Sequence, residues 1–217
     1  MKHRWTAALL ALALVLALPF SAAAETFSTE DFTMEIPEGT YVFTPTTSTE
    51  DPNWAMAGVA NPESELSTLA EMNGVAELVT EDGETTILVQ QQESDQTQAY
   101  FNLRYLTEKQ QADFLDAIMQ SQTDEITVDK YYLDVDGQPF YRIRIDGTYQ
   151  ETGYHELIYG TIVNGFTLAF NIYGGEESVT QEQEDLLLGI VESVQFPESL
   201  PKTETTVDTS DIVTTIS

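Results

Sequence analysis

The chain has 217 residues, of which 37 are Asp or Glu and eight are Lys or Arg, so its formal net charge at neutral pH is −29. A nucleic-acid-binding protein needs clustered basic side chains to displace counterions from phosphates, and this acidic excess argues against that class. The sequence contains no cysteine, which excludes disulfides, thiolate nucleophiles and zinc–thiolate sites.

Residues 1–24 have the pattern of a secretory signal peptide. Lys2 and Arg4 give a basic start, an apolar run follows over residues 7–18, and small residues lead up to Ala24. The apolar run is much shorter than the ~20 residues that a membrane-spanning helix needs. We therefore expect cleavage after Ala24 and a secreted or extracytoplasmic protein that is soluble after cleavage, with no transmembrane segment left.

Residues 25–198 have the length and patterning of a single α/β domain. Alternating apolar and polar residues predict strands at 31–36, 40–44, 75–80, 85–91, 126–135, 138–145, 157–163 and 166–173. The last three pairs of these strands flank typical hairpin turns: Asp82-Gly83, Asp136-Gly137 and Asn164-Gly165. Residues 46–61 are expected to be irregular.

Three amphipathic helices are predicted from residues typical of helix N-caps, namely Asn61, Thr107 and Thr180. Thr107 is followed by Gln110 and Thr180 by Gln183, which is the spacing of a capping box. Apolar residues at helical spacing follow the three caps: Leu66, Leu69 and Ala70; then Phe114, Leu115, Ile118 and Met119; then Leu187, Ile190, Val191 and Val194.

The hairpins also predict how the sheet is arranged. A two-residue turn in the hairpin 126–145 places Asp129 opposite Arg144 and Tyr131 opposite Arg142. The hairpin 157–173 is apolar on both faces, as expected of central strands that are covered on both sides. The chain is therefore predicted to be an α+β protein with a central antiparallel sheet of about six or more strands and helices on both faces.

The order of these elements resembles the PsbP/Mog1-like α/β/α sandwich, a fold found in exported bacterial proteins of unknown function. The similarity extends from the alternating opening at 32–37 to the amphipathic closing segment 190–196. It implies the fold and brings no catalytic motif with it, because members of one fold carry different functions. The Thr-, Ser- and acid-rich residues 199–217 are expected to form a disordered tail.

Two residues are candidates for ligand contact. Trp54 lies in the expected irregular segment, where its ring could stack on a sugar or a peptide. His155 is the only histidine after residue 24, and it is not part of a Gly-x-Ser-x-Gly elbow or a two-histidine zinc motif. The segment 134–138 has some acidic residues of a calcium loop, but its spacing favours a hairpin turn. We assign no catalytic, cofactor-binding or metal-binding residue.

The leading hypothesis is an exported, acidic, non-enzymatic domain that acts as a binding or accessory module outside the cytoplasmic membrane. Its partner is expected to be an extracellular or envelope ligand or protein, and no cofactor or nucleic acid is expected. Two alternatives remain open. One is a secreted hydrolase that uses His155 or an acidic pair, and the other is a binder of divalent cations or cationic ligands.

Overall fold

The computed structural model describes residues 25–118, 126–149 and 151–197. In these ranges the strands form two antiparallel sheets, one of two strands and one of seven. The small sheet pairs β1 (Glu25–Ser28) with β2 (Thr33–Ile36). The large sheet has the strand order β3 (Thr40–Phe43), β4 (Gly74–Thr80), β5 (Thr86–Glu93), β9 (Phe166–Gly175), β8 (Thr152–Val163), β7 (Gln138–Tyr149) and β6 (Ile126–Val135).

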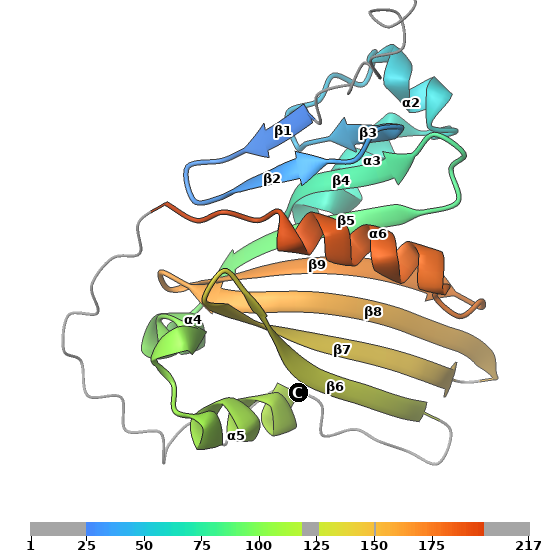
Figure 1. Cartoon of the computed structure of the whole chain (residues 1–217). Coiled ribbons are helices and arrows are strands. Elements are labelled where there is room, and N and C mark those ends of the chain that lie inside the picture. The colour runs from blue at the N-terminus through green and yellow to red at the C-terminus, as the bar shows by residue number, and fades with distance from the viewer. Residues whose placement is uncertain (1–24, 119–125, 150, 198–217) are drawn as a thin grey trace, which may run out of the picture.

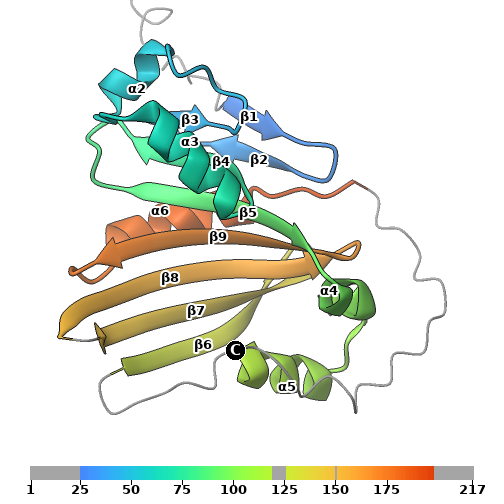
Figure 2. The same ribbon diagram turned by 180° about the vertical axis from the view of Figure 1, so that it is seen from behind.

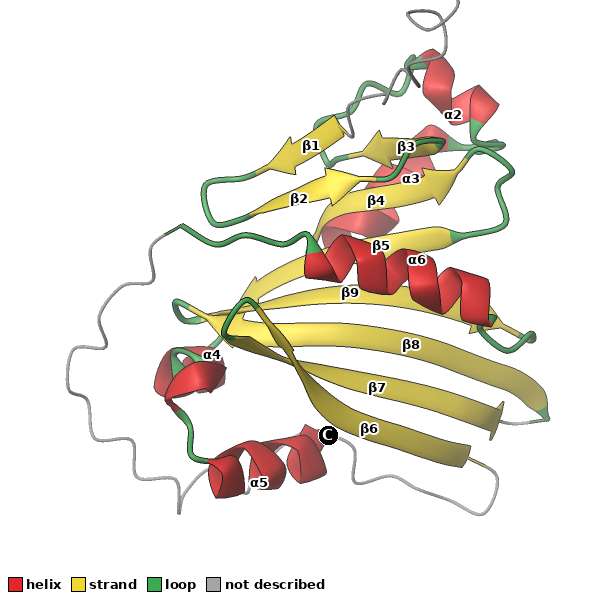
Figure 3. Ribbon diagram, viewed as in Figure 1, coloured by secondary structure: helices red, strands yellow, loops and turns green. Residues whose placement is uncertain are grey.

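Helices cover both faces of the large sheet (Figures 1 and 2). The described helices are α2 (Pro52–Met56), α3 (Pro62–Glu71), α4 (Asp95–Tyr100), the 3-10 helix η1 (Leu103–Tyr105), α5 (Glu108–Ile118) and α6 (Gln181–Glu192). Helix α6 and the β1–β2 hairpin lie on one face, and α3 and α5 lie on the other, as Figure 3 shows by colour. The predicted α/β/α sandwich around an antiparallel sheet is confirmed.

The main core lies between the sheet and α6. Leu187, Ile190 and Val191 of α6 are at most 1% exposed and pack with Phe170 of β9 and Met34 of β2. Strand β9 is the fourth of seven, so the hairpin that is apolar on both faces is central, as predicted. Burial of large apolar side chains, at roughly 1.5–3 kcal/mol each, is what holds α6 to the sheet.

The opposite face carries two smaller apolar clusters instead of one. Phe114 and Leu115 of α5 pack on Ile143 of β7 at one side of the sheet. Phe43 and Val79 pack with residues of α2 and α3 at the other side. Between these clusters, β9 and part of β8 have no helix directly over them in Figure 2, so the cover expected on both sides of this hairpin is incomplete.

The register of the β6–β7 hairpin is the predicted one. Asp129 pairs with Arg144 and Tyr131 pairs with Arg142. The turn residue Asp136 has a φ of 50°, which Asp tolerates better than most residues do. The predicted capping boxes are also confirmed, since Thr107 and Gln110, and Thr180 and Gln183, exchange the expected hydrogen bonds.

Some elements differ from the prediction. Residues 46–61, expected to be irregular, contain α2, because Asp51 caps the backbone of Asn53 and a proline occupies the first turn. Helix α4 was not predicted, although Ser94 and Thr97 form a capping box at its start. Strand β8 begins at Thr152, earlier than expected, because its polar first half pairs with β7.

Several predictions lie outside the described residues: the signal peptide with cleavage after Ala24, the tail 199–217, and Met119 of the predicted helical stripe. None of the helices in the described ranges combines the length and the hydrophobicity that crossing a bilayer requires.

Candidate functional site

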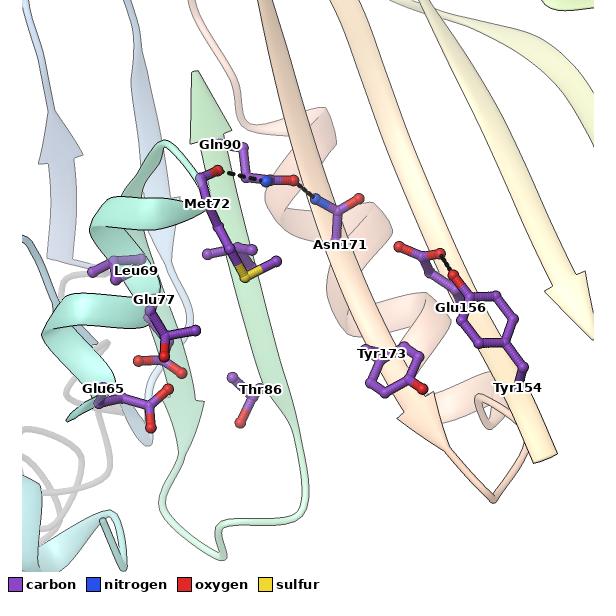
Figure 4. A pocket seen from close by; sticks show the side chains of 12 residues that line it. Glu65, Leu69, Met72, Glu77, Thr86, Gln90, Tyr154, Glu156, Asn171 and Tyr173 are labelled. Atoms are coloured by element: carbon purple, nitrogen blue, oxygen red, sulfur yellow. Dashed lines mark hydrogen bonds between the residues drawn. The ribbon is translucent and has the colours of Figure 1, made fainter. Parts of the chain in front are cut away.

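A groove lies on the sheet face opposite α6, between α3 and the strands that no helix covers (Figure 4). Its volume is about 500 Å³, within the size range of small-molecule sites. It is lined by α3 on one side and by four strands below: Glu65, Thr68, Leu69, Met72, Glu77, Thr86, Leu88, Gln90, Tyr154, Glu156, Asn171 and Tyr173.

The strand register explains how these distant residues come together. Glu77 of β4 pairs with Leu88 of β5, which pairs with Asn171 of β9. Paired residues in neighbouring strands point to the same face of a sheet. The three side chains therefore form one row across the floor of the groove, although 94 positions of sequence separate the first from the last.

A glycine at the start of β4 allows helix α3 to lie close to the floor. A Cβ atom at Gly74 would overlap with Cδ1 of Leu69 and would lie 2.9 Å from the Leu69 carbonyl oxygen. The side-chain amide of Gln90 also donates to the Met72 carbonyl oxygen at 2.7 Å, which ties the end of the helix to β5. These contacts fix the helical wall of the groove.

One end of the groove holds two carboxyl groups that face each other, those of Glu65 and Glu77 (Figure 4). Glu77 is 8% exposed. Its Oε2 atom is buried and has no hydrogen-bond partner among the described residues. Burial, followed by the negative charge of Glu65 and a hydrogen bond with the Glu65 side chain, raises the pKa of Glu77 from 4.5 to about 7. A carboxyl group that titrates near neutrality in a groove is a functional-site candidate.

The other end of the groove is aromatic and polar. The rings of Tyr154 and Tyr173 lie 5.5 Å apart between centroids at an interplanar angle of 60°. The Tyr154 hydroxyl donates to Oε2 of Glu156 at 2.7 Å, and Tyr173 is 61% exposed. The Asn171 amide donates to Oε1 of Gln90 along the floor. A lining that combines apolar side chains with a few polar groups is typical of a site for a small organic ligand.

Trp54 does not line this groove, and its assignment as a ligand contact needs correction. The residue is 2% exposed, and its ring stacks on Phe43 with centroids 3.6 Å apart and planes 8° from parallel. Its indole nitrogen donates to the Ser48 carbonyl oxygen at 2.8 Å. The ring is therefore part of a small core under α2 and is not available to stack on a ligand.

His155 lies outside the groove lining, and its contacts do not have the geometry of a hydrolytic triad. Its Nδ1 atom is 2.9 Å from Oδ1 of Asp146 and 3.2 Å from the Ser178 hydroxyl. In a triad the carboxylate binds one ring nitrogen and the nucleophilic hydroxyl binds the other. Here Asp146 and Ser178 contact the same nitrogen, so the ring cannot relay a proton from one to the other.

The segment that has some acidic residues of a calcium loop is the β6–β7 turn. Oδ1 of Asp134 accepts a hydrogen bond from the Gly137 backbone at 3.0 Å, so this carboxylate stabilises the turn. Across the described ranges, no three or more His, Asp or Glu side chains are grouped so that they could hold a metal ion.

The groove residues were not singled out from the sequence, although some carry a signal. Glu77 interrupts the apolar run of β4, and Asn171 lies between Phe170 and Ile172 in a largely apolar strand. A polar residue is costly to bury without a partner, so it is unexpected within an apolar strand pattern. Such interruptions could therefore have identified two of the residues on the floor.

Comparisons with known proteins give a limited result. No protein-family model matches the chain, and no curated protein matches it. Among solved structures, it is similar to cyanobacterial PsbP from Synechocystis sp. PCC 6803, with a TM-score of 0.44 and 11% sequence identity over 82% of this chain and 96% of that one. A likeness at this level concerns the fold alone and carries no information on function.

Proposed function

We propose that this chain is an exported, non-enzymatic binding or accessory module that holds a small organic ligand in the groove beside α3. The observation that carries the proposal is the groove itself, whose lining combines apolar side chains such as Leu69, Met72 and Leu88 with polar groups at both ends. A concave site of this kind, built on strands and one helix wall, is preorganised for binding.

Export is the second part of the proposal, and it is supported by the signal-peptide pattern of residues 1–24. Expression of the full chain in a bacterium, followed by fractionation, tests it. Mass spectrometry of the protein outside the cytoplasmic membrane should find Glu25 as the first residue. Full-length protein that stays in the cytoplasmic fraction would contradict export and would leave the groove proposal standing.

Binding at the groove is tested with a panel of neutral, anionic and cationic fragments. NMR chemical-shift changes of the labelled protein report which fragments bind and where. Thr86 is exposed on β5 at the groove, so Thr86→Trp should fill the space and abolish the shifts. Gln92→Trp places the same ring on the same strand and face, outside the lining, and should leave them intact. Shifts that persist in Thr86→Trp, or that centre elsewhere, would refute the proposal.

A hydrolase remains the second candidate, because one observation favours it. Glu65 and Glu77 converge in the groove, and the pKa of Glu77 is raised to about 7, as expected of a carboxyl group that serves as a general acid. Turnover of glycoside or ester substrates that is lost in Glu77→Gln would favour this candidate over a binding module. Retained ligand binding without turnover would favour the module.

A further inference from the structure

We propose that the ligand of the groove is an organic amine, whose ammonium group binds between Glu65 and Glu77 and whose apolar body lies along the floor. This inference rests on the proposed binding function of the groove and names the chemical class of its ligand. Its experiment is designed so that the two proposals can fail separately.

The charge of the lining favours a cation. Three of the lining residues are glutamates, Glu65 and Glu77 at one end and Glu156 at the other, and none of the described lining residues is basic. An anionic ligand would meet like charge at either end, which disfavours binding. A cationic group at either end would find an opposite charge in a partly desolvated site, where electrostatic attraction is stronger than in water.

Glu77 supplies the observation that points to a ligand. The residue is 8% exposed and lines the groove. Its carboxyl group has a hydrogen bond with the Glu65 side chain, yet its Oε2 atom is buried and lacks a hydrogen-bond partner among the described residues. A buried acceptor that lacks a hydrogen-bond partner is unfavourable, and more so when it is charged. An ammonium group carries three N–H donors, so one such group could donate to Glu77 and Glu65 together and neutralise the charge that they share.

The floor of the groove suits an aliphatic body and not a hydrated metal ion. Leu69, Met72 and Leu88 supply apolar side chains to the same lining as the carboxyl pair. Calcium takes six to eight oxygen ligands, and the described residues provide no cluster of three acidic groups for it. The amine therefore explains both the acidic end and the apolar side chains of the lining.

The far end offers a second place for positive charge. Tyr173 presents an exposed ring, and the hydroxyl of Tyr154 already directs one oxygen of Glu156 toward the rings. The electron-rich face of a tyrosine ring attracts an ammonium group, also at an exposed site. A linear diamine that spans the floor should therefore bind more tightly than a monoamine of the same length.

Binding of the amine should depend on pH because it competes with a proton. Around Glu77, α3 contributes Glu65, whereas the paired residues of β3 and β5 are Phe43 and Leu88, which do not titrate. The remaining charged group of the lining is Glu156 at the far end. An alkyl ammonium stays protonated to about pH 10. Affinity should therefore rise by about tenfold between roughly pH 6 and pH 8, as Glu77 loses its proton.

The test measures binding of hexylamine, hexamethylenediamine, hexanol, hexanoate and calcium ion to the full chain by calorimetry and NMR at about pH 8. Both amines should bind at the groove, the diamine more tightly, and hexanol should bind at least about tenfold more weakly. Glu77→Gln should weaken amine binding by about tenfold. Glu63→Gln, an exposed change on the same helix outside the lining, should not alter it.

Each of the other results refutes the amine proposal, the groove proposal or both. Hexanol binding as tightly as hexylamine, with shifts abolished in Thr86→Trp, would refute the amine and keep the binding groove. Calcium binding at the groove in preference to either amine would also refute the amine. Amine binding that Thr86→Trp leaves unchanged would refute both proposals. If none of the probes binds while other fragments do bind the groove, only the amine is refuted.

Discussion

Arg142 on β7 and Glu184 on α6 form an ion pair between the helix and the sheet. Nε and Nη2 of Arg142 each lie 2.7 Å from Oε1 of Glu184, and the residues are 5% and 8% exposed. The other oxygen, Oε2, accepts from Nη1 of Arg144 at 3.0 Å. The carboxylate of Glu184 therefore partly neutralises the positive charge of two arginine side chains on the sheet face that α6 covers.

Replacement of Glu184 by alanine should destabilise the protein by about 3 kcal/mol, because it leaves buried guanidinium charge with less compensation. The measurement is the free energy of unfolding from urea denaturation. Glu192→Ala, on the exposed last turn of the same helix, is the matched control and should change stability by no more than about 0.5 kcal/mol. Equal effects of the two substitutions would show that the ion pair contributes nothing.

The same cluster shows what could be predicted from the sequence and what could not. The pairing of Asp129 with Arg144 follows from a two-residue turn, which is a local signal, and it was predicted. The ion pair of Asp129 is nevertheless made to Arg142, at 2.8 Å. Arg144 turns instead toward Asp146 and Glu184. Register is set by the backbone, whereas the choice of partner depends on where α6 lies.

The groove could not be predicted from the sequence, because it too depends on elements that are distant in the chain. Its floor requires β5 to pair with β9, two strands that are far apart in the sequence. Hairpin signals join only strands that are consecutive in the chain. Trp54 illustrates the opposite error, because an aromatic residue between turn residues looks exposed until Phe43 is placed against it.

Glu77 should make stability depend on pH. Its folded-state pKa of about 7 lies above the ordinary value of 4.5, so the folded protein holds this proton more tightly than the unfolded chain does. The stability that the proton contributes is fully present below about pH 4.5 and is lost as pH rises through 7.

Glu77→Gln should remove this pH dependence between about pH 4.5 and 7, and at about pH 8 it should raise stability by roughly 1–3 kcal/mol. Thermal unfolding across this range is the measurement, with Glu63→Gln as the control that keeps the slope. An unchanged slope in Glu77→Gln would assign the pH dependence to other groups.

Trp54→Ala should cost about 3–5 kcal/mol in stability, as for other large aromatic residues in a core, and it should leave binding at the groove unchanged. Met56, on the same short helix, is 61% exposed, and Met56→Ala should shift stability by no more than about 0.5 kcal/mol. Chemical denaturation gives both values. A loss of ligand affinity in Trp54→Ala at full stability would restore Trp54 as a binding residue.

Gly74 and Gly189 offer a paired test of how α3 is positioned. A methyl group at Gly74 would overlap with Leu69, so Gly74→Ala must push α3 away from β4. Overpacking of this kind costs about 1–3 kcal/mol. Because Leu69 and Met72 belong to the groove wall, the same change should also weaken ligand binding there. In α6, by contrast, nothing lies within 4 Å of a Cβ built at Gly189.

Gly189→Ala should therefore stabilise the protein by about 1 kcal/mol through helix propensity alone and leave the groove unaffected. Opposite signs of the two glycine substitutions are the expected result, measured as free energies of unfolding together with the affinity of a groove ligand. If Gly74→Ala were as stable as the parent protein and bound ligand equally well, α3 would not need its close approach to β4. The helix would then not be the fixed wall on which the binding site depends.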